Sequence, residues 1–320
     1  MVHRVGIIGA GDIAQRTYLP LLAEREDCKL VAIYSRTRGP ASKLAKKFGI
    51  EHVYDNLEEF LERSDIGTVF ICTPTETHLK IVKAALKYSK NVLIEKPLTT
   101  VYDDDVSLLK LARLQSKNFC VAFNNYYREE NEWLRSKVLE GTLGEVQIIN
   151  IEWYRALPFP SVGPHQGDQP SGVLMHLGAK LLSVALRLLP ERRSFNVVCQ
   201  NLKRAGGPTA DEDTSFSSIV IDEKVTVNIR LGWDIALPIH SQTNMEVFGK
   251  KGKISNRDYN GPESDGHKNM INEFLERNNS GEHMDLDLVE DTMTLLNALY
   301  QSHQTKTAVS GKFAQTSKKD

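Results

Sequence analysis

The sequence predicts an α/β protein of two domains, in which a doubly wound parallel sheet precedes an α+β domain with a mostly antiparallel, open-faced sheet. The chain of 320 residues is long enough for two ordinary domains. Up to about residue 124, short apolar stretches alternate with amphipathic helical stretches, a pattern typical of βαβ units. After about residue 130, strand-like stretches predominate, which is typical of an α+β domain.

Hydrophobic periodicity predicts the individual elements. The first half contains five expected strands, with a helical stretch after each of the first four, at residues 4–10, 29–35, 66–74, 91–97 and 119–124. The second half contains five expected strands, at about residues 145–155, 194–202, 214–221, 224–233 and 243–248. Helices are expected there at about residues 172–189 and 285–303. We therefore expect one domain at residues 1–124, a second at 125–303, and a polar C-terminal tail at 304–320.

The composition argues for a cytoplasmic protein that binds neither nucleic acid nor a membrane. The net charge is −1, so no excess of basic residues points to a polyanionic partner. We expect no signal peptide, and no uninterrupted apolar run reaches transmembrane length. The four cysteines form no zinc-type cluster, and their sparse use favours reduced thiols.

A dinucleotide fingerprint lies at the end of the first strand, in the sequence "GAGDIA". Gly9 allows a tight turn, Gly11 lets a pyrophosphate approach the backbone, and Ala14 permits close packing of the helix on the strand. Asp12 and Ile13 belong to the same expected cofactor-binding loop. The motif follows a strand and opens a helix, as a Rossmann domain requires, although a glycine-rich turn without a ligand is the alternative.

The end of the second strand favours NADP(H) over NAD(H). An NAD-specific site usually has an acidic residue there, whereas this chain has Ser35, Arg36, Thr37 and Arg38. Ser35 and Thr37 can donate hydrogen bonds to a 2′-phosphate, and Arg36 can pair with it or stack on adenine. The alternative is that Arg36 and Arg38 are solvated loop charges.

A lysine lies where the nicotinamide of such a cofactor would bind. The fourth strand ends in Glu95, Lys96 and Pro97, and ligands of open α/β sheets bind beyond the carboxyl ends of the strands. Lys96 can bond a substrate oxygen and assist proton transfer, and Glu95 can orient it. The alternative is a lysine that extends from a strand end into solvent.

Four segments together resemble the Gfo/Idh/MocA oxidoreductases: "VGIIGAGDIA", "CTPTETH", "IEKP" and "AFNNYYR". The α+β second half and "GTLGEV" match in organisation. The resemblance implies NAD(P)-dependent hydride transfer between a carbinol and a ketone, most often on a sugar or cyclitol. It also implies that Lys96 lies near the reacting carbon, and that the peptide before Pro97 is often cis.

Other positions take roles from the resemblance one at a time. Thr73 and Pro74 match the loop after the third strand, close to the cofactor. His78 matches a common histidine, for which a backbone-bonding role is at least as strong an alternative as a ligand role. Asn124 matches the asparagine near the nicotinamide or substrate, and the role of Asn125 on the substrate is less defined.

The second-domain helix departs from the family pattern. "SGVLMHLGAKLLS" places His176 at the usual aspartate, Lys180 at the usual histidine and Ser183 at a second aspartate. With Lys96, the site would hold three basic groups, which lowers their pKa values by repulsion and favours an anionic substrate. Either His176 or Lys180 can then donate the proton. The alternatives are that catalysis has been lost, or that both residues only line a binding cleft.

Weaker candidates for substrate binding are Tyr154 and Arg155 on the strand that opens the second domain, and His165 in the following loop. Strand alternation directs Tyr154 away from Arg155. A surface ion pair is an equal alternative for Arg155, and a plain loop role is an alternative for His165. No constellation in the sequence indicates a metal.

The leading hypothesis is an NADP(H)-dependent oxidoreductase that acts on a small polar molecule. A nucleotide-binding regulatory protein without turnover is the alternative from another class, and reduction of an imine is the third. By analogy with the family, we expect a homo-oligomer, either a dimer or a tetramer.

Overall fold

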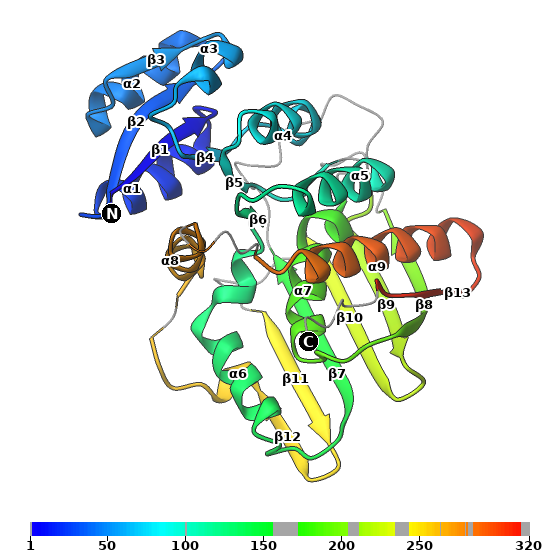
Figure 1. The fold of residues 1–320 in the computed structure, drawn as a ribbon. Helices are drawn as coiled ribbons and strands as arrows, with labels where there is room; N and C mark the ends of the chain where they lie inside the picture. The colour runs from blue at the N-terminus through cyan, green and yellow to red at the C-terminus, as the bar shows by residue number, and fades with distance from the viewer. Residues whose placement is uncertain are drawn as a thin grey trace. The chain divides into compact units, whose positions relative to one another are not determined.

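The structure is a computed structural model that describes residues 2–99, 101–155, 172–203, 211–233, 243–262, 264–278, 280 and 284–314. The chain forms two compact units (Figure 1). Unit 1 comprises Met1–Ala122 and His267–Leu286, and unit 2 comprises Phe123–Gly266 and Asp287–Asp320.

Unit 1 is built on a six-stranded parallel sheet with the order β3-β2-β1-β4-β5-β6. Its strands are β1 (His3–Ile8), β2 (Cys28–Tyr34), β3 (His52–Tyr54), β4 (Thr68–Ile71), β5 (Asn91–Ile94) and β6 (Phe119–Val121). The five strands expected from the sequence are confirmed. The additional strand, β3, is a three-residue edge strand whose residues are all half-buried, so it lacks an apolar run.

Helices pack on the sheet of unit 1 in two groups. Their bounds are α1 (Leu19–Ala23), α2 (Arg38–Phe48), α3 (Leu57–Glu62), α4 (His78–Lys87), α5 (Tyr102–Arg113) and α8 (His267–Arg277). Helix α1 contacts α2, whereas α4 contacts both α3 and α5, as expected for a doubly wound sheet (Figure 1).

The helix that follows the glycine motif begins with a π-helical turn, η1 (Ala14–Tyr18). The Leu19 N–H donates to the Ala14 carbonyl, five residues back. Pro20 follows directly and has no N–H to continue an ordinary helical ladder. The turn buries Tyr18 completely, and its ring contacts the ring of Phe70 in β4 at 5.5 Å between centroids.

Helix α8 belongs to unit 1 although it follows the strands of unit 2 in the sequence. Asn118, which is fully buried before β6, donates to the Phe274 carbonyl across 2.9 Å. The ring of Phe274 also contacts that of Phe70, with centroids 5.7 Å apart. A buried amide and an aromatic contact therefore fix this helix on the parallel sheet.

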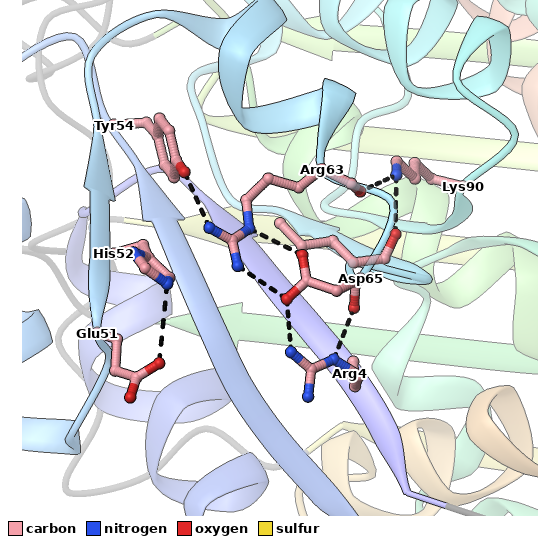
Figure 2. Close-up of polar contacts among 8 residues, drawn as sticks. Arg4, Glu51, His52, Tyr54, Arg63, Asp65 and Lys90 are labelled. Atoms are coloured by element: carbon pink, nitrogen blue, oxygen red, sulfur yellow. Dashed lines mark hydrogen bonds and ion pairs between the residues drawn. The ribbon is translucent and has the colours of Figure 1, made fainter.

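Figure 2 shows an ionic network among segments near β1, β3, β4 and β5 of unit 1. Arg63 donates to both carboxylate oxygens of Asp65, at 2.9 and 2.8 Å, and Arg4 donates to the same carboxylate. Arg63 also donates to the Tyr54 hydroxyl, and the Lys90 ammonium donates to two backbone carbonyls at 2.8 Å each. The network connects segments of unit 1 without any residue that lines the cavity described below.

Unit 2 contains a seven-stranded mixed sheet with the order β12-β11-β7-β10-β9-β8-β13, in which only the β7–β10 pairing of the described strands is parallel. The mostly antiparallel sheet expected for the second domain is therefore confirmed. Its elements are α6 (Glu129–Leu139), β7 (Val146–Arg155), α7 (Ala179–Arg187), β8 (Ser194–Leu202), β9 (Thr214–Ile221), β10 (Val225–Trp233), β11 (Asn244–Gly249), β12 (Gly252–Ser255), α9 (Leu286–Thr305) and β13 (Val309–Lys312).

The two faces of the unit 2 sheet differ. Val227, Ile229 and Leu231 of β10 are buried on one face, where a Cβ added at Gly178 would lie 3.5 Å from the Leu231 side chain. The helical segment that carries Gly178 thus packs closely on β10. The opposite face leaves apolar side chains exposed, among them Phe216 at 43%.

The expected polar tail at residues 304–320 contains a strand. Residues 309–312 form β13 and pair antiparallel with β8. Phe313 follows the strand and is 4% exposed, and its ring contacts that of Phe195 at 5.1 Å between centroids. Burial of this one aromatic side chain stabilises a segment whose overall composition is polar.

Candidate active site

A cavity of about 700 Å³ opens at the carboxyl ends of the strands of unit 1. It lies where β1 has β2 on one side and β4 on the other, the point at which strand order changes direction. Seven of the expected cofactor residues line it, namely Gly9, Gly11, Ser35, Arg36, Thr37, Thr73 and Pro74. The structure thus brings together segments from the ends of three strands.

Gly9 fits its predicted place for two reasons. Its φ of +108° is in the region that favours glycine. A Cβ at Gly9 would also lie 2.8 Å from the Cys72 carbonyl oxygen, so only glycine allows β1 and β4 to end this close together. Gly11 has no close neighbour at its Cβ position except that oxygen at 4.0 Å, which leaves open space where a pyrophosphate would approach.

Asp12 and Ile13, also expected in the cofactor loop, do not line the cavity. The Asp12 carboxylate lies 3.6 Å from the Arg16 guanidinium one helical turn later, and both side chains are exposed. Their direct role toward a cofactor stays a prediction.

The cavity end near β2 contains both signs of charge. Arg36 lines it, as expected, and the Ser35 hydroxyl accepts the Thr37 N–H at 3.3 Å. Asp55 also lines it, from the turn that follows β3, and lies 3.6 Å from the Arg38 guanidinium. This carboxylate is not predicted from the sequence, because β3, the strand that brings Asp55 beside the end of β2, is not predicted either.

Lys96 is the second residue after β5, and its neighbour Glu95, which directly follows the strand, is held from two sides. The buried Tyr18 hydroxyl donates to Glu95 Oε1 across 2.5 Å, and the Lys96 N–H donates to Glu95 Oε2 across 3.2 Å. The Lys96–Pro97 peptide is cis, as the family resemblance implied. Neither Glu95 nor Lys96 lines the described cavity.

His78 connects the cavity to the Lys96 turn. Its side chain is buried, with 1% exposed. Nε2 lies 2.9 Å from the Thr73 carbonyl oxygen, and Nδ1 lies 3.0 Å from that of Pro97 and 3.1 Å from that of Leu98. Burial lowers the pKa of His78 below its ordinary value. Both ring nitrogens thus face backbone carbonyls, and the neutral ring that burial favours donates to one side only.

Asn124 and Asn125 lie in a 3₁₀ turn, η3 (Asn124–Tyr127), at the start of unit 2. The Asn124 amide donates to the Asp265 carbonyl across 2.7 Å. Asn125 is 3% exposed, and its side-chain nitrogen has no hydrogen-bond partner among the described residues. Both side chains are therefore buried at positions that the sequence assigned to ligand contacts.

His176 and Lys180 lie on successive turns of one helical segment of unit 2. His176 is in a second π-helical turn, η4 (Leu174–Gly178), and Lys180 follows in α7. The His176 ring contacts that of the buried Trp233 at 5.6 Å between centroids. Ser183 is fully buried and donates to the Lys180 carbonyl, so its hydroxyl is used within the helix.

Arg155 ends β7 directly beside Trp233 of β10. Its guanidinium lies 5.5 Å from the ring centroid of Trp153, and burial lowers the pKa of Arg155 to about 10. Tyr154 pairs with Gly232 in the register and points to the opposite face. The structure therefore places Arg155, but not Tyr154, on the sheet face that carries His176, and His165 lies outside the described residues.

Among the described residues, no group of three or more histidine, cysteine or acidic side chains could hold a metal ion. Within the same residues, no helix is both long and apolar enough to cross a membrane.

Comparisons with known proteins place the chain in a family. A model of the oxidoreductase family with an NAD-binding Rossmann fold matches residues 3–123, and a model of the GFO/IDH/MocA C-terminal domain matches residues 132–255. The chain belongs to the Gfo/Idh/MocA oxidoreductase family. It is 32% identical over 257 residues to a dTDP-3,4-didehydro-2,6-dideoxy-alpha-D-glucose 3-reductase from Saccharopolyspora spinosa, a match of 78% of this chain and 73% of that protein.

The chain also matches a second reductase and a solved dehydrogenase structure. It is 30% identical over 204 residues to the reductase of the same name from Streptomyces antibioticus; the match spans 63% of this chain and 61% of that enzyme. The solved myo-inositol dehydrogenase from Lactobacillus casei, in complex with NAD(H) and myo-inositol, superposes with a TM-score of 0.84 over 99% of both chains at 17% identity. This structural likeness shows that the two proteins share a fold.

Proposed function

We propose that this Gfo/Idh/MocA protein transfers a hydride between NADP(H) and a carbonyl or carbinol carbon of a sugar, cyclitol or derivative. The observation that carries the proposal is the connection from the cofactor-type cavity to Lys96. His78 lies within hydrogen-bond distance of the Thr73 carbonyl at the cavity and of the Pro97 and Leu98 carbonyls beside Lys96. This link between the backbone beside Lys96 and the cavity supports a role for the lysine in proton transfer coupled to hydride transfer.

The cavity end near β2 supports NADP(H) as the preferred cofactor. The Arg36 guanidinium and the hydroxyls of Ser35 and Thr37 are the groups that would hold a 2′-phosphate there. Asp55 opposes this preference, but its carboxylate lies 3.6 Å from Arg38, which partly offsets its charge. Cofactor selectivity therefore depends on the balance between the charges of Arg36, Arg38 and Asp55.

Three basic side chains are the candidates for proton transfer in this proposal, namely Lys96, His176 and Lys180. The bound cofactor supplies or accepts the hydride. In the reducing direction, the carbonyl π bond breaks, the carbon gains the hydride, and its oxygen gains a proton from the Lys96 ammonium or from His176 or Lys180. We propose that Glu95 orients Lys96. Three further residues are proposed to contact the substrate, namely Asn125, Arg155 and His165. Tyr154, on the other face of its strand, has weaker support for such a role.

The names of the relatives support a sugar-type substrate. The Saccharopolyspora and Streptomyces relatives are named as 3-reductases of a dTDP-linked didehydro-dideoxy-glucose. The three basic candidates Lys96, His176 and Lys180, with Arg155 beside Trp233, favour a substrate that also carries an anionic group. A phosphorylated or nucleotide-linked keto-sugar meets both conditions.

The experiment is a turnover assay with NADPH and NADH over a panel of keto-sugars, with and without phosphate groups, and of cyclic imines. We expect turnover that Lys96→Met lowers by about 10²- to 10⁴-fold, while Lys110→Met, at an exposed position of α5, leaves it unchanged. Tight NADPH binding without turnover of any substrate would favour a regulatory binding protein. Turnover with cyclic imines alone would instead favour imine reduction.

We further propose that the protein is a homo-oligomer in the cytoplasm. Val198, Leu202 and Phe216 are 52%, 46% and 43% exposed on the open face of the unit 2 sheet, in neighbouring strands β8 and β9. A second copy of the chain would cover this apolar patch. Light scattering should give a dimer or tetramer that Phe216→Glu weakens. Four free cysteines, three of them buried, support a reducing compartment.

A further inference from the structure

The first backbone amides of the helical segment that carries His176 donate hydrogen bonds to an acidic residue far away in the sequence. The Val173 N–H donates to the Glu212 backbone carbonyl across 2.9 Å. The Leu174 N–H donates to the Glu212 side-chain Oε1 across 3.1 Å. The π-helical turn that carries His176 has no side-chain cap of its own. Glu212 therefore satisfies two of the amides that the start of a helix leaves without partners.

A second helix holds the Glu212 carboxylate in place. The Tyr300 hydroxyl of α9 donates to Glu212 Oε1 across 2.9 Å, so this oxygen accepts from both Tyr300 and Leu174. Glu212 is 9% exposed, and burial raises its pKa above the ordinary value. A buried acceptor with two donors from different elements has little freedom to move.

Position 172 has room only for glycine beside this carboxylate. A Cβ added at Gly172 would lie 1.9 to 2.2 Å from the Glu212 carboxyl carbon and oxygens, which is impossible without displacement of Glu212. The backbone of Gly172 is not in the left-handed region, so this contact is the obstacle to alanine. The Gly172 carbonyl in turn accepts the His176 N–H across 3.1 Å. Gly172, Glu212 and the first turn before His176 thus form one interlocked unit.

We propose that Glu212, held by Tyr300 and accommodated by Gly172, is a positioning residue that fixes the rotation of the helical segment bearing His176 and Lys180. The inference rests on the proposed function, because it assigns Glu212 to the proton-donating side of that reaction. A rotation of a helical turn moves side chains at i and i+4 together, so both candidate donors depend on the same contact. A displacement of about 1 Å at such a group can reduce turnover by about 10²-fold.

The test uses four variants of the full chain, with Glu223→Ala on an exposed turn as a control. Glu212→Ala and Gly172→Ala should each lower kcat by about 10- to 100-fold and leave the Kd of NADPH unchanged, because the cofactor cavity is formed by unit 1. Glu212→Gln should retain most activity, since its amide oxygen still accepts both donors. The double variant should be no worse than Glu212→Ala alone, because alanine at 172 then meets no carboxylate.

Hydrogen exchange gives a readout that does not require turnover. The amides of residues 173–176 should exchange about tenfold faster in Glu212→Ala, with little change in Glu212→Gln. If no variant or wild type turns over any substrate while exchange behaves as expected, the proposed function fails and the structural contact stands. Equal losses of kcat for the glutamine and alanine variants, or additive losses in the double variant, would overturn the positioning role.

Discussion

The Tyr18 hydroxyl donates to Glu95 Oε1 across 2.5 Å in the interior of unit 1. Tyr18 ends the π-helical turn after the glycine motif, and Glu95 precedes Lys96. The bond therefore joins the helix expected to face the cofactor phosphates to the segment expected to handle the proton. Burial and the nearby Glu95 carboxylate raise the pKa of Tyr18 well above its ordinary value, so the tyrosine remains a donor at neutral pH.

Tyr18→Phe should affect Lys96 indirectly, through Glu95. The substitution removes the hydroxyl and leaves Glu95 Oε1 without this donor, at a cost in stability of about 1–3 kcal/mol. We expect kcat to fall on the order of 10-fold or more while the Kd of NADPH changes little. Tyr88→Phe is the matched control, because the Tyr88 hydroxyl bonds Glu62 at the exposed surface. An unchanged kcat in Tyr18→Phe would mean that the Tyr18–Glu95 hydrogen bond does not contribute to the reaction.

Arg36 and Asp55 should shift cofactor selectivity in opposite directions. Arg36→Ala should raise the KM for NADPH by roughly 10- to 100-fold, the worth of a charged hydrogen bond, with a small effect on NADH. Asp55→Asn should improve NADPH relative to NADH, because a negative charge leaves the same cavity. Glu51→Gln, which does not line the cavity, is the control. A protein that uses NADH better than NADPH before any substitution would refute the preference.

The sequence predicted the parts of the site that depend on local patterns. Gly9 and Lys96 could be placed because each follows an apolar strand, and parallel strands end at one edge of a sheet. Asp55 could not be placed, since β3 is three residues long and lacks an apolar run. Glu212 was missed for another reason: it meets Gly172 across 40 residues of sequence, and only the tertiary fold shows this contact. Covariation between glycine at position 172 and an acidic residue at position 212, in an alignment of relatives, is the signal that could have found it.

Asp65 should contribute to stability in a pH-dependent way. Hydrogen bonds from Arg63 and then from Arg4 hold the pKa of Asp65 below its ordinary value of 3.8 (Figure 2). A lowered carboxyl pKa gives stability that is present above pH 3.8 and is lost as the pH falls below it. Asp65→Asn should therefore lower the melting temperature at pH 7, and the difference from wild type should shrink below about pH 4. The side chain is 32% exposed, so the effect should be modest, about 1 kcal/mol.

Asp105 should have the opposite pH dependence. It lies in the first turn of α5, is 2% exposed, and its Oδ1 has no hydrogen-bond partner among the described residues. Burial raises its pKa from 3.8 to about 7, although hydrogen bonds from Thr99 favour the charged form. Between these two values the folded state keeps a proton that the unfolded state has released. Stability therefore falls as the pH rises from about 4 to about 7, and stays lower above pH 7.

Asp105→Asn should remove this dependence, because an amide is neutral throughout and can still accept from Thr99. We expect the variant to be about 1–3 kcal/mol more stable than wild type at pH 8, the range for an unsatisfied buried polar group, and close to wild type at pH 4.5. Thermal melts at both values measure the difference. Asp103→Asn is the matched control, because Asp103 is exposed in the same helical turn. A gain of equal size at both pH values would mean that packing, rather than the charge of Asp105, separates the variant from wild type.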